Sequence, residues 1–255
     1  MVGASLSLCL PLLWADLANS QRSTKMAGIR ERSWLCYKAA PSNGVTLMFS
    51  ATEVVEIFPS CLWLHEIADC ETMNNNVDAS VKELRAAGTG RERSDGGGWT
   101  SPTDLHERDE FVPLTECLAK GAEGVLHFLR FKFDHFYISE CWANLSRVGD
   151  DHPRHNHPNA MLSGVYYVRA PENCGAITFY DPRPQASVLY PAVQDSTPHN
   201  SHRHTIGPGE GLLILFPSWL EHSVERNESG NERLSISFNV MLAGDIGYET
   251  GLVRL

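Results

Sequence analysis

The sequence predicts a mostly β domain in which two α-helices precede an antiparallel jelly roll. Apolar residues recur at helical spacing in two early segments, and the helical period disappears after residue 133. Five short β-rich runs follow, each bounded by Pro, Gly, Asn or Asp, which is the pattern of an all-β sandwich or barrel. Residues 51–255 are long enough to form this as one domain with a sizeable core.

Both helices are predicted from apolar residues three or four positions apart, because such residues lie on one face of a helix. These residues are Met73, Val77, Val81 and Leu84 in the first helix, and Leu114, Leu118, Ala122, Val125 and Leu129 in the second. The first helix should end near Gly88. Residues 51–64 are expected to form a short strand that enters the domain. Residues 88–104, rich in Gly, Ser and Thr, are expected to form a loop.

Strands are predicted where β-branched and aromatic residues concentrate between turn-forming residues. The five predicted strands cover residues 136–146, 162–168, 176–180, 211–216 and 234–242.

The first fifty residues differ in charge from the rest of the chain. They contain two acidic and five basic residues, although the whole chain has a net charge of −10. An organelle transit segment, a disordered tail, and a true start at Met26 or Met48 all remain open for residues 1–50. The apolar run 6–14 is much shorter than the roughly 20 residues of a membrane span.

The composition indicates which kinds of partner and which cellular compartment to expect. A sequence pI of about 5.5 without long basic runs disfavours binding to nucleic acid or to anionic membranes, and favours a small-molecule or protein substrate. Seven widely spaced cysteines without a CxxC pair favour a reducing intracellular compartment. That compartment would be the cytoplasm, or an organelle if residues 1–50 are a transit peptide. The oligomeric state is not indicated.

Three histidines form the main candidate site. His155 and His157 lie two residues apart in the segment DDHPRHNHPN (150–159), so in an extended conformation both project to the same side and can hold one ion. His222 follows the predicted strand 211–216, and an antiparallel roll can bring it beside the first two. Three ligands on one face of an octahedral ion leave three open positions, as in the mononuclear iron oxygenases.

Arg233 and Ser235 come eleven and thirteen residues after His222, at the start of the next predicted strand. They share a strand face and can anchor a carboxylate. The alternative for Arg233 is a solvated charge at the end of a strand.

Several motifs occur in the order found in one family. His155 and His157, LSGVYYV (162–168), EGLLILFPSWLEHSV (210–224) and RLSISFN (233–239) resemble the 2-oxoglutarate–iron(II) oxygenases. The resemblance is strongest to the branch with the motifs H-x-H-P-x-x-x-L-S-G-V-Y-Y and F-P-S-W-L-x-H, and it covers about residues 55–242. It implies a double-stranded β-helix (a cupin-like jelly roll) with Fe(II), 2-oxoglutarate as cosubstrate, and O2. The implied reaction is hydroxylation of an unidentified substrate, with release of succinate and CO2.

The resemblance also implies roles for individual residues. His155 matches the first histidine of the metal motif and His222 the distal histidine. Arg233 matches the residue that pairs with the far carboxylate of 2-oxoglutarate, with Ser235 beside it. Tyr167 matches a strand position that reaches the same carboxylate in some relatives.

His157 departs from the family pattern, because most relatives have Asp or Glu at this position. A third imidazole would raise the charge of the site by one, and three-histidine dioxygenases bind iron in this way. Two alternatives therefore stay open: a three-histidine iron dioxygenase that uses no 2-oxoglutarate, and a non-catalytic jelly-roll binding module. Asp150, Asp151 and Asp181 are the alternative carboxylate candidates for the third ligand in place of His157.

Overall fold

A computed structural model describes residues 53–93, 98–184, 188–189, 191–248 and 250–254. The chain divides into two units, residues 1–55 and residues 56–255. The predicted leader, residues 1–50, lies outside the described residues. The second unit contains every helix and strand described below.

Both predicted helices are confirmed. α1 (Glu71–Ala86) and α2 (Val112–Leu129) bury the apolar faces that the spacing identified, and two short 3-10 turns, η1 (Leu105–Glu107) and η2 (Asp109–Phe111), lead into α2. Proline in the first turn of α2 is compatible with a helix start, because its missing N–H would have no partner there. Among the described residues, no helix is both long and apolar enough to cross a membrane.

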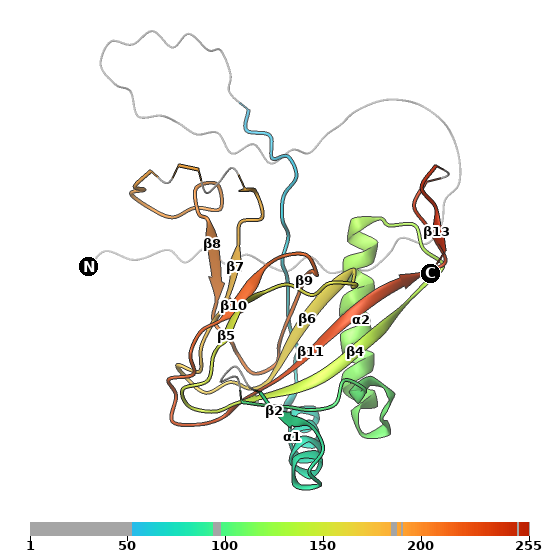
Figure 1. Ribbon diagram of the computed structural model, residues 1–255, viewed down its shortest axis with the longest axis vertical. Coiled ribbons are helices and arrows are strands. Elements are labelled where there is room, and N and C mark those ends of the chain that lie inside the picture. Colours follow the sequence, from blue (N-terminus) through green and yellow to red (C-terminus); the bar gives the residue numbers. More distant parts are fainter. Residues whose placement is uncertain (1–52, 94–97, 185–187, 190, 249, 255) are drawn as a thin grey trace, which may run out of the picture. The chain divides into compact units, whose positions relative to one another are not determined.

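The strands form two large sheets, and every pairing between named strands is antiparallel. The major sheet has the order β1 (Trp63–Glu66), β9 (Leu212–Pro217), β6 (Leu162–Arg169), β11 (Arg233–Ala243), β4 (His135–Ser146), β3 (Trp99–Thr100) and β2 (Arg91–Glu92). The minor sheet has the order β5 (His152–His155), β10 (His222–Val224), β7 (Ile177–Tyr180) and β8 (Arg203–Ile206). A separate hairpin joins β12 (Asp245–Ile246) to β13 (Val253–Arg254). The predicted jelly roll with flanking helices is confirmed (Figure 1).

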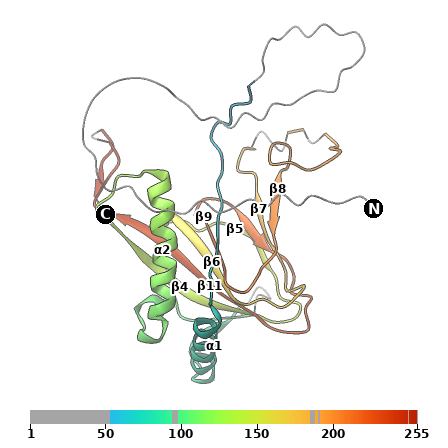
Figure 2. The same ribbon diagram turned by 180° about the vertical axis from the view of Figure 1, so that it is seen from behind.

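The two faces of the major sheet have different surroundings. Figures 1 and 2 show α2 lying across one face, and β5, β10, β7 and β8 lie on the other side. Along β11, Leu234, Ile236 and Phe238 join the core shared with the helices, whereas Arg233 and Ser235 line a pocket between the sheets. This alternation follows from the two-residue period of a strand. It places polar side chains inside the roll.

Three expectations about local structure need correction. The strand predicted within residues 51–64 begins only at Trp63, where pairing with β9 starts, and upstream Phe58 is 92% exposed. The loop predicted for residues 88–104 contains β2 and β3. Trp99 is buried there and pairs with Leu145 of β4. The segment forms strands because β4 supplies hydrogen-bond partners, whereas its own residues do not predict a strand. The short strands β5, β8 and β10 were not predicted.

The five cysteines within the described ranges carry free thiols. Cys141 and Cys174 are buried, as expected for small hydrophobic residues.

Candidate metal centre and cosubstrate pocket

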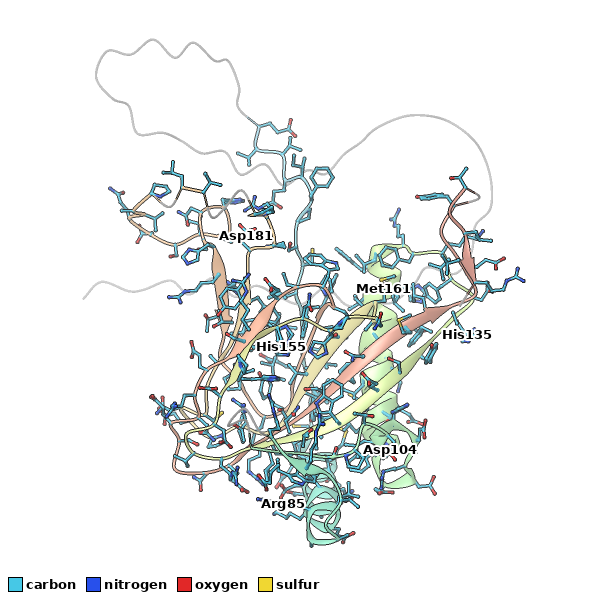
Figure 3. The ribbon with its side chains drawn as sticks, in the orientation of Figure 1. Arg85, Asp104, His135, His155, Met161 and Asp181 are labelled. Carbon is cyan, nitrogen blue, oxygen red and sulfur yellow. The ribbon has the colours of Figure 1, made fainter. Side chains whose placement is uncertain are left out.

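The three predicted metal ligands lie together in the minor sheet and its adjoining loop. His155 ends β5, His222 begins β10, and the register of these strands sets the two histidines directly opposite each other. His157 lies in the loop after β5. One ligand atom from each of the three residues lies within 4.8 Å of the other two, which is compatible with a single bound ion. His155, labelled in Figure 3, lines the pocket between this sheet and the major sheet.

Hydrogen bonds at the Nδ1 atoms determine which ring nitrogen can bind a metal. In His155 and His222, Nδ1 bonds the backbone carbonyl two residues earlier, at 2.9 and 3.0 Å. In His157, Nδ1 bonds the Asn239 side-chain oxygen Oδ1 at 3.0 Å. A carbonyl oxygen can only accept, so Nδ1 carries the proton in all three rings and Nε2 has the lone pair. Such bonds orient metal-binding histidines in known sites.

Burial keeps two of these rings neutral. The pKa of His222 is lowered to about 3, mainly by burial and in smaller part by the nearby His155. Burial also lowers the pKa of His157 to about 4, with a second contribution from His155. Metal ligation requires the neutral imidazole. At neutral pH both rings are already neutral, so no proton has to be removed before a metal binds.

The nearby carboxylates have other partners or lie elsewhere. Asp150 accepts a bond from the Arg147 backbone N–H at 2.7 Å. Asp181 binds the guanidinium of Arg183 through both oxygens, and Figure 3 shows it at the end of β7, apart from His155. Asp151 lines the pocket, but no carboxylate of the described chain belongs to the group that could hold a metal. His157 is therefore the third ligand that this arrangement offers.

Arg233 lies in the same pocket as the histidines, with only 5% of its surface exposed. Its NH1 atom donates to the backbone carbonyls of Cys174 and Gly175, at 2.7 and 3.1 Å. Its Nε atom is buried and has no hydrogen-bond partner within the described ranges, and no described acidic residue forms an ion pair with it. A buried cationic donor without a partner is costly, so this edge of the guanidinium is suited to an anionic ligand.

Tyr167 and Ser235 stand beside this arginine. They are directly opposite each other on β6 and β11, both are buried, and both line the pocket. Burial raises the pKa of Tyr167 to about 12, although Arg233 acts in the opposite direction. Its phenol therefore stays protonated at neutral pH and can donate to a carboxylate.

A second hollow, of about 1100 Å³, lies among residues 181–205 in and beside the β7–β8 connection. His199, His202 and His204 line it, but they do not meet as a metal-binding group among the residues described. The smaller pocket lies between the sheets and contains the clustered histidines and Arg233. It is the better candidate for an active site, because it combines metal-binding groups with a buried cation.

Sequence reasoning missed two residues that contact His157. Asn239 accepts its Nδ1 proton, and Trp142 stacks on its ring with centroids 5.8 Å apart. The sequence contained a signal for Asn239, because the two-residue period that links Arg233 to Ser235 reaches it two steps later. No signal in the sequence pointed to Trp142 as a neighbour of His157.

The region that carries this site matches a known family. Residues 140–239 match the family model described as "Putative 2OG-Fe(II) oxygenase". This segment is thus similar to the 2OG-Fe(II) oxygenases. The resemblance predicted from the motifs is confirmed, and the matched segment includes all six predicted site residues. A search of curated proteins found no match.

Solved structures share the fold of this domain. A prolyl-4-hydroxylase from Pseudomonas putida is 17% identical, with 72% of this chain and 94% of that chain covered and a TM-score of 0.53. The alpha-ketoglutarate-dependent epimerase SnoN from nogalamycin biosynthesis is 16% identical, with coverages of 77% and 88% and a TM-score of 0.56. HygX from Streptomyces hygroscopicus, with nickel and 2-oxoglutarate bound, is 10% identical, with coverages of 74% and 86% and a TM-score of 0.50.

Proposed function

We propose that this chain is an iron(II)- and 2-oxoglutarate-dependent oxygenase that hydroxylates an organic substrate, with release of succinate and CO2. The observation that carries the proposal is one pocket that contains both a three-histidine cluster and a buried arginine whose Nε has no partner among the described residues.

His155, His157 and His222 would hold the iron through their Nε2 atoms. Imidazole nitrogen is a suitable ligand for iron(II), and three ligands leave positions for a cosubstrate and for dioxygen. When bound, iron(II) with 2-oxoglutarate and dioxygen supplies the oxidising chemistry. Phe216 packs edge-on against His222 with ring centroids 4.7 Å apart, and its apolar ring shields the His222 imidazole from water on that side.

Arg233, Tyr167 and Ser235 would bind the far carboxylate of 2-oxoglutarate. NH1 of Arg233 is used by two backbone carbonyls, which leaves the Nε–NH2 edge for a bidentate contact. The protonated Tyr167 phenol and the Ser235 hydroxyl add neutral donors on the same side of the sheet. Both functional groups of the cosubstrate thereby find partners in one pocket.

A three-histidine dioxygenase that uses no 2-oxoglutarate is the second candidate. It is favoured by the imidazole of His157 at the position where most members of the family have a carboxylate. This alternative would leave the Nε atom of Arg233 without a ligand, which is the reason to prefer the 2-oxoglutarate-dependent reaction.

Anaerobic titration with iron(II), with and without 2-oxoglutarate, tests the proposal. The domain should bind one iron. His155→Ala and His222→Ala should abolish tight binding, whereas His135→Ala, at an exposed histidine of β4, should not change it. Under air and with 2-oxoglutarate present, the iron-loaded domain should form succinate slowly even when no substrate to be hydroxylated is added. Full iron occupancy in both site variants would move the metal elsewhere, and succinate formation that never exceeds a metal-free control would favour the cosubstrate-free candidate.

A further inference from the structure

His157 differs from the other two proposed ligands in what fixes its tautomer. Backbone carbonyls accept the Nδ1 protons of His155 and His222, and a backbone carbonyl cannot exchange its oxygen for a donor. The partner of His157 is the side-chain amide of Asn239, which presents an oxygen on one side and an NH2 group on the other. Only the oxygen leaves Nε2 of His157 with its lone pair. Whatever orients this amide therefore determines whether His157 can bind a metal through Nε2.

A row of polar residues across the major sheet orients the amide. Glu140 on β4, Asn239 on β11 and Ser163 on β6 are direct neighbours in the strand register. The Asn239 Nδ2 atom donates to a carboxylate oxygen of Glu140 at 2.8 Å, and the Ser163 hydroxyl donates to Asn239 Oδ1 at 2.8 Å. An ionised carboxylate only accepts, so Nδ2 must face Glu140 and Oδ1 must face His157.

The row continues to a second serine and returns to His157. The Ser163 and Ser218 hydroxyls lie 2.9 Å apart, and both residues are fully buried. The Ser163 proton is directed to Asn239, so Ser218 is the donor in this bond. The Ser218 carbonyl accepts the backbone N–H of His157 at 3.0 Å. The main chain and the ring of His157 are thus held by the same chain of hydrogen bonds.

We propose that Asn239 and Glu140 are positioning residues that hold His157 in the tautomer able to bind the metal through Nε2. The inference rests on the proposed function, because His157 must be a ligand for its tautomer to matter. A reversed amide would put Oδ1 against the Glu140 carboxylate and Nδ2 against His157. The ring would then carry its proton on Nε2, and that atom could not coordinate. Glu140 is solvent-exposed, so it can be changed without opening a cavity.

Charge reversal at Glu140 tests the inference directly. In Glu140→Lys the ammonium group is a donor and attracts Oδ1, so it favours the reversed amide. In Glu140→Gln the side-chain oxygen can still accept from Nδ2, so the orientation is kept. The matched control is Glu221→Lys. The side chain of Glu221 is 45% exposed, and Glu221 is the sequence neighbour of His222, but its partner is Arg154, and it does not belong to the polar row.

Two measurements are made on the four proteins. Imidazole nitrogen NMR of the metal-free domain reports the tautomer of His157, and titration with cobalt(II) alone reports metal affinity. We expect Glu140→Lys to shift His157 to the Nε2–H tautomer and to weaken cobalt binding about 10–100-fold, as for other changes behind a metal-binding histidine. Glu140→Gln should stay within about threefold of the wild type, and Glu221→Lys should keep the Nδ1–H tautomer.

Other outcomes would overturn the inference. An unchanged His157 tautomer in Glu140→Lys would do so, as would equal losses of affinity in Glu140→Lys and Glu221→Lys, since that result would indicate only a general charge effect. If the wild type binds no cobalt, the proposed metal site fails. The tautomer in the metal-free proteins still tests the role of Glu140 separately.

Discussion

Replacing Arg233 should weaken 2-oxoglutarate binding and leave iron binding unchanged. Two of its donors are used by the carbonyls of Cys174 and Gly175, so the contact with a carboxylate depends on the remaining Nε–NH2 edge. In Arg233→Lys the single ammonium group can keep the charge and the carbonyl bonds but cannot form the two-pronged contact. Loss of one hydrogen bond to a charged group costs about 1.5–3 kcal/mol, which corresponds to roughly a 10–150-fold weaker Kd for 2-oxoglutarate.

Arg233→Met removes both hydrogen bonds and the charge, so its effect should be larger. Two such bonds amount to about 3–6 kcal/mol, enough to raise the Kd for 2-oxoglutarate by at least a hundredfold. Iron affinity should stay near that of the wild type, because no hydrogen bond joins Arg233 to the three histidines. Arg169→Lys is the matched control, since Arg169 pairs with Asp78 on the helical side of the sheet and does not line the pocket.

Anaerobic calorimetric titration of the metal-free proteins with iron(II) measures iron binding, and titration of the iron-loaded proteins with 2-oxoglutarate measures cosubstrate binding. Succinate formation over a range of 2-oxoglutarate concentrations gives an independent value. If Arg233→Lys and Arg233→Met bind 2-oxoglutarate as the wild type does, Arg233 is a structural charge. The three-histidine, cosubstrate-free candidate would then be the better one.

Three further outcomes concern stability. The metal-free domain should lose stability as the pH falls from 6.5 towards 4, because His157 and His222 take up protons in the unfolded chain but stay neutral in the folded domain. Each of the two histidines should lower the free energy of unfolding by about 1.4 kcal/mol per pH unit. Urea unfolding at pH 7 and 5 should show a flatter pH dependence in His222→Asn, and parallel curves would contradict the assigned cause. Gly164→Ala should cost about 1–3 kcal/mol in the free energy of unfolding, because the added methyl group meets the buried ring of Phe238. Removing residues 1–47 should change neither the melting temperature nor iron affinity, and a large drop in melting temperature would show that this segment packs on the domain.

Local pattern was sufficient for the longer elements. The spacing of Val77 and Val81 identified α1, and strands such as β11 were found because β-branched and aromatic residues concentrate in runs bounded by turn-forming residues. Short strands such as β5 and β10 have three or four residues, among them histidine, arginine and proline. Their strand conformation comes from hydrogen bonds with neighbours in the minor sheet, and no local propensity predicts it.

The site divides in the same way between sequence and structure. By itself the sequence determined the family motifs, the pairing of His155 with His157 two residues apart, and the shared face of Arg233 and Ser235, since these depend on strand period and residue type. Only the tertiary structure set His222 opposite His155, left Nε of Arg233 without a partner among the described residues, and aligned Asn239 with its neighbours behind His157. These features depend on register between distant strands. A slip of one residue turns every side chain to the opposite face of the sheet, and the register is set by the packing of the whole domain.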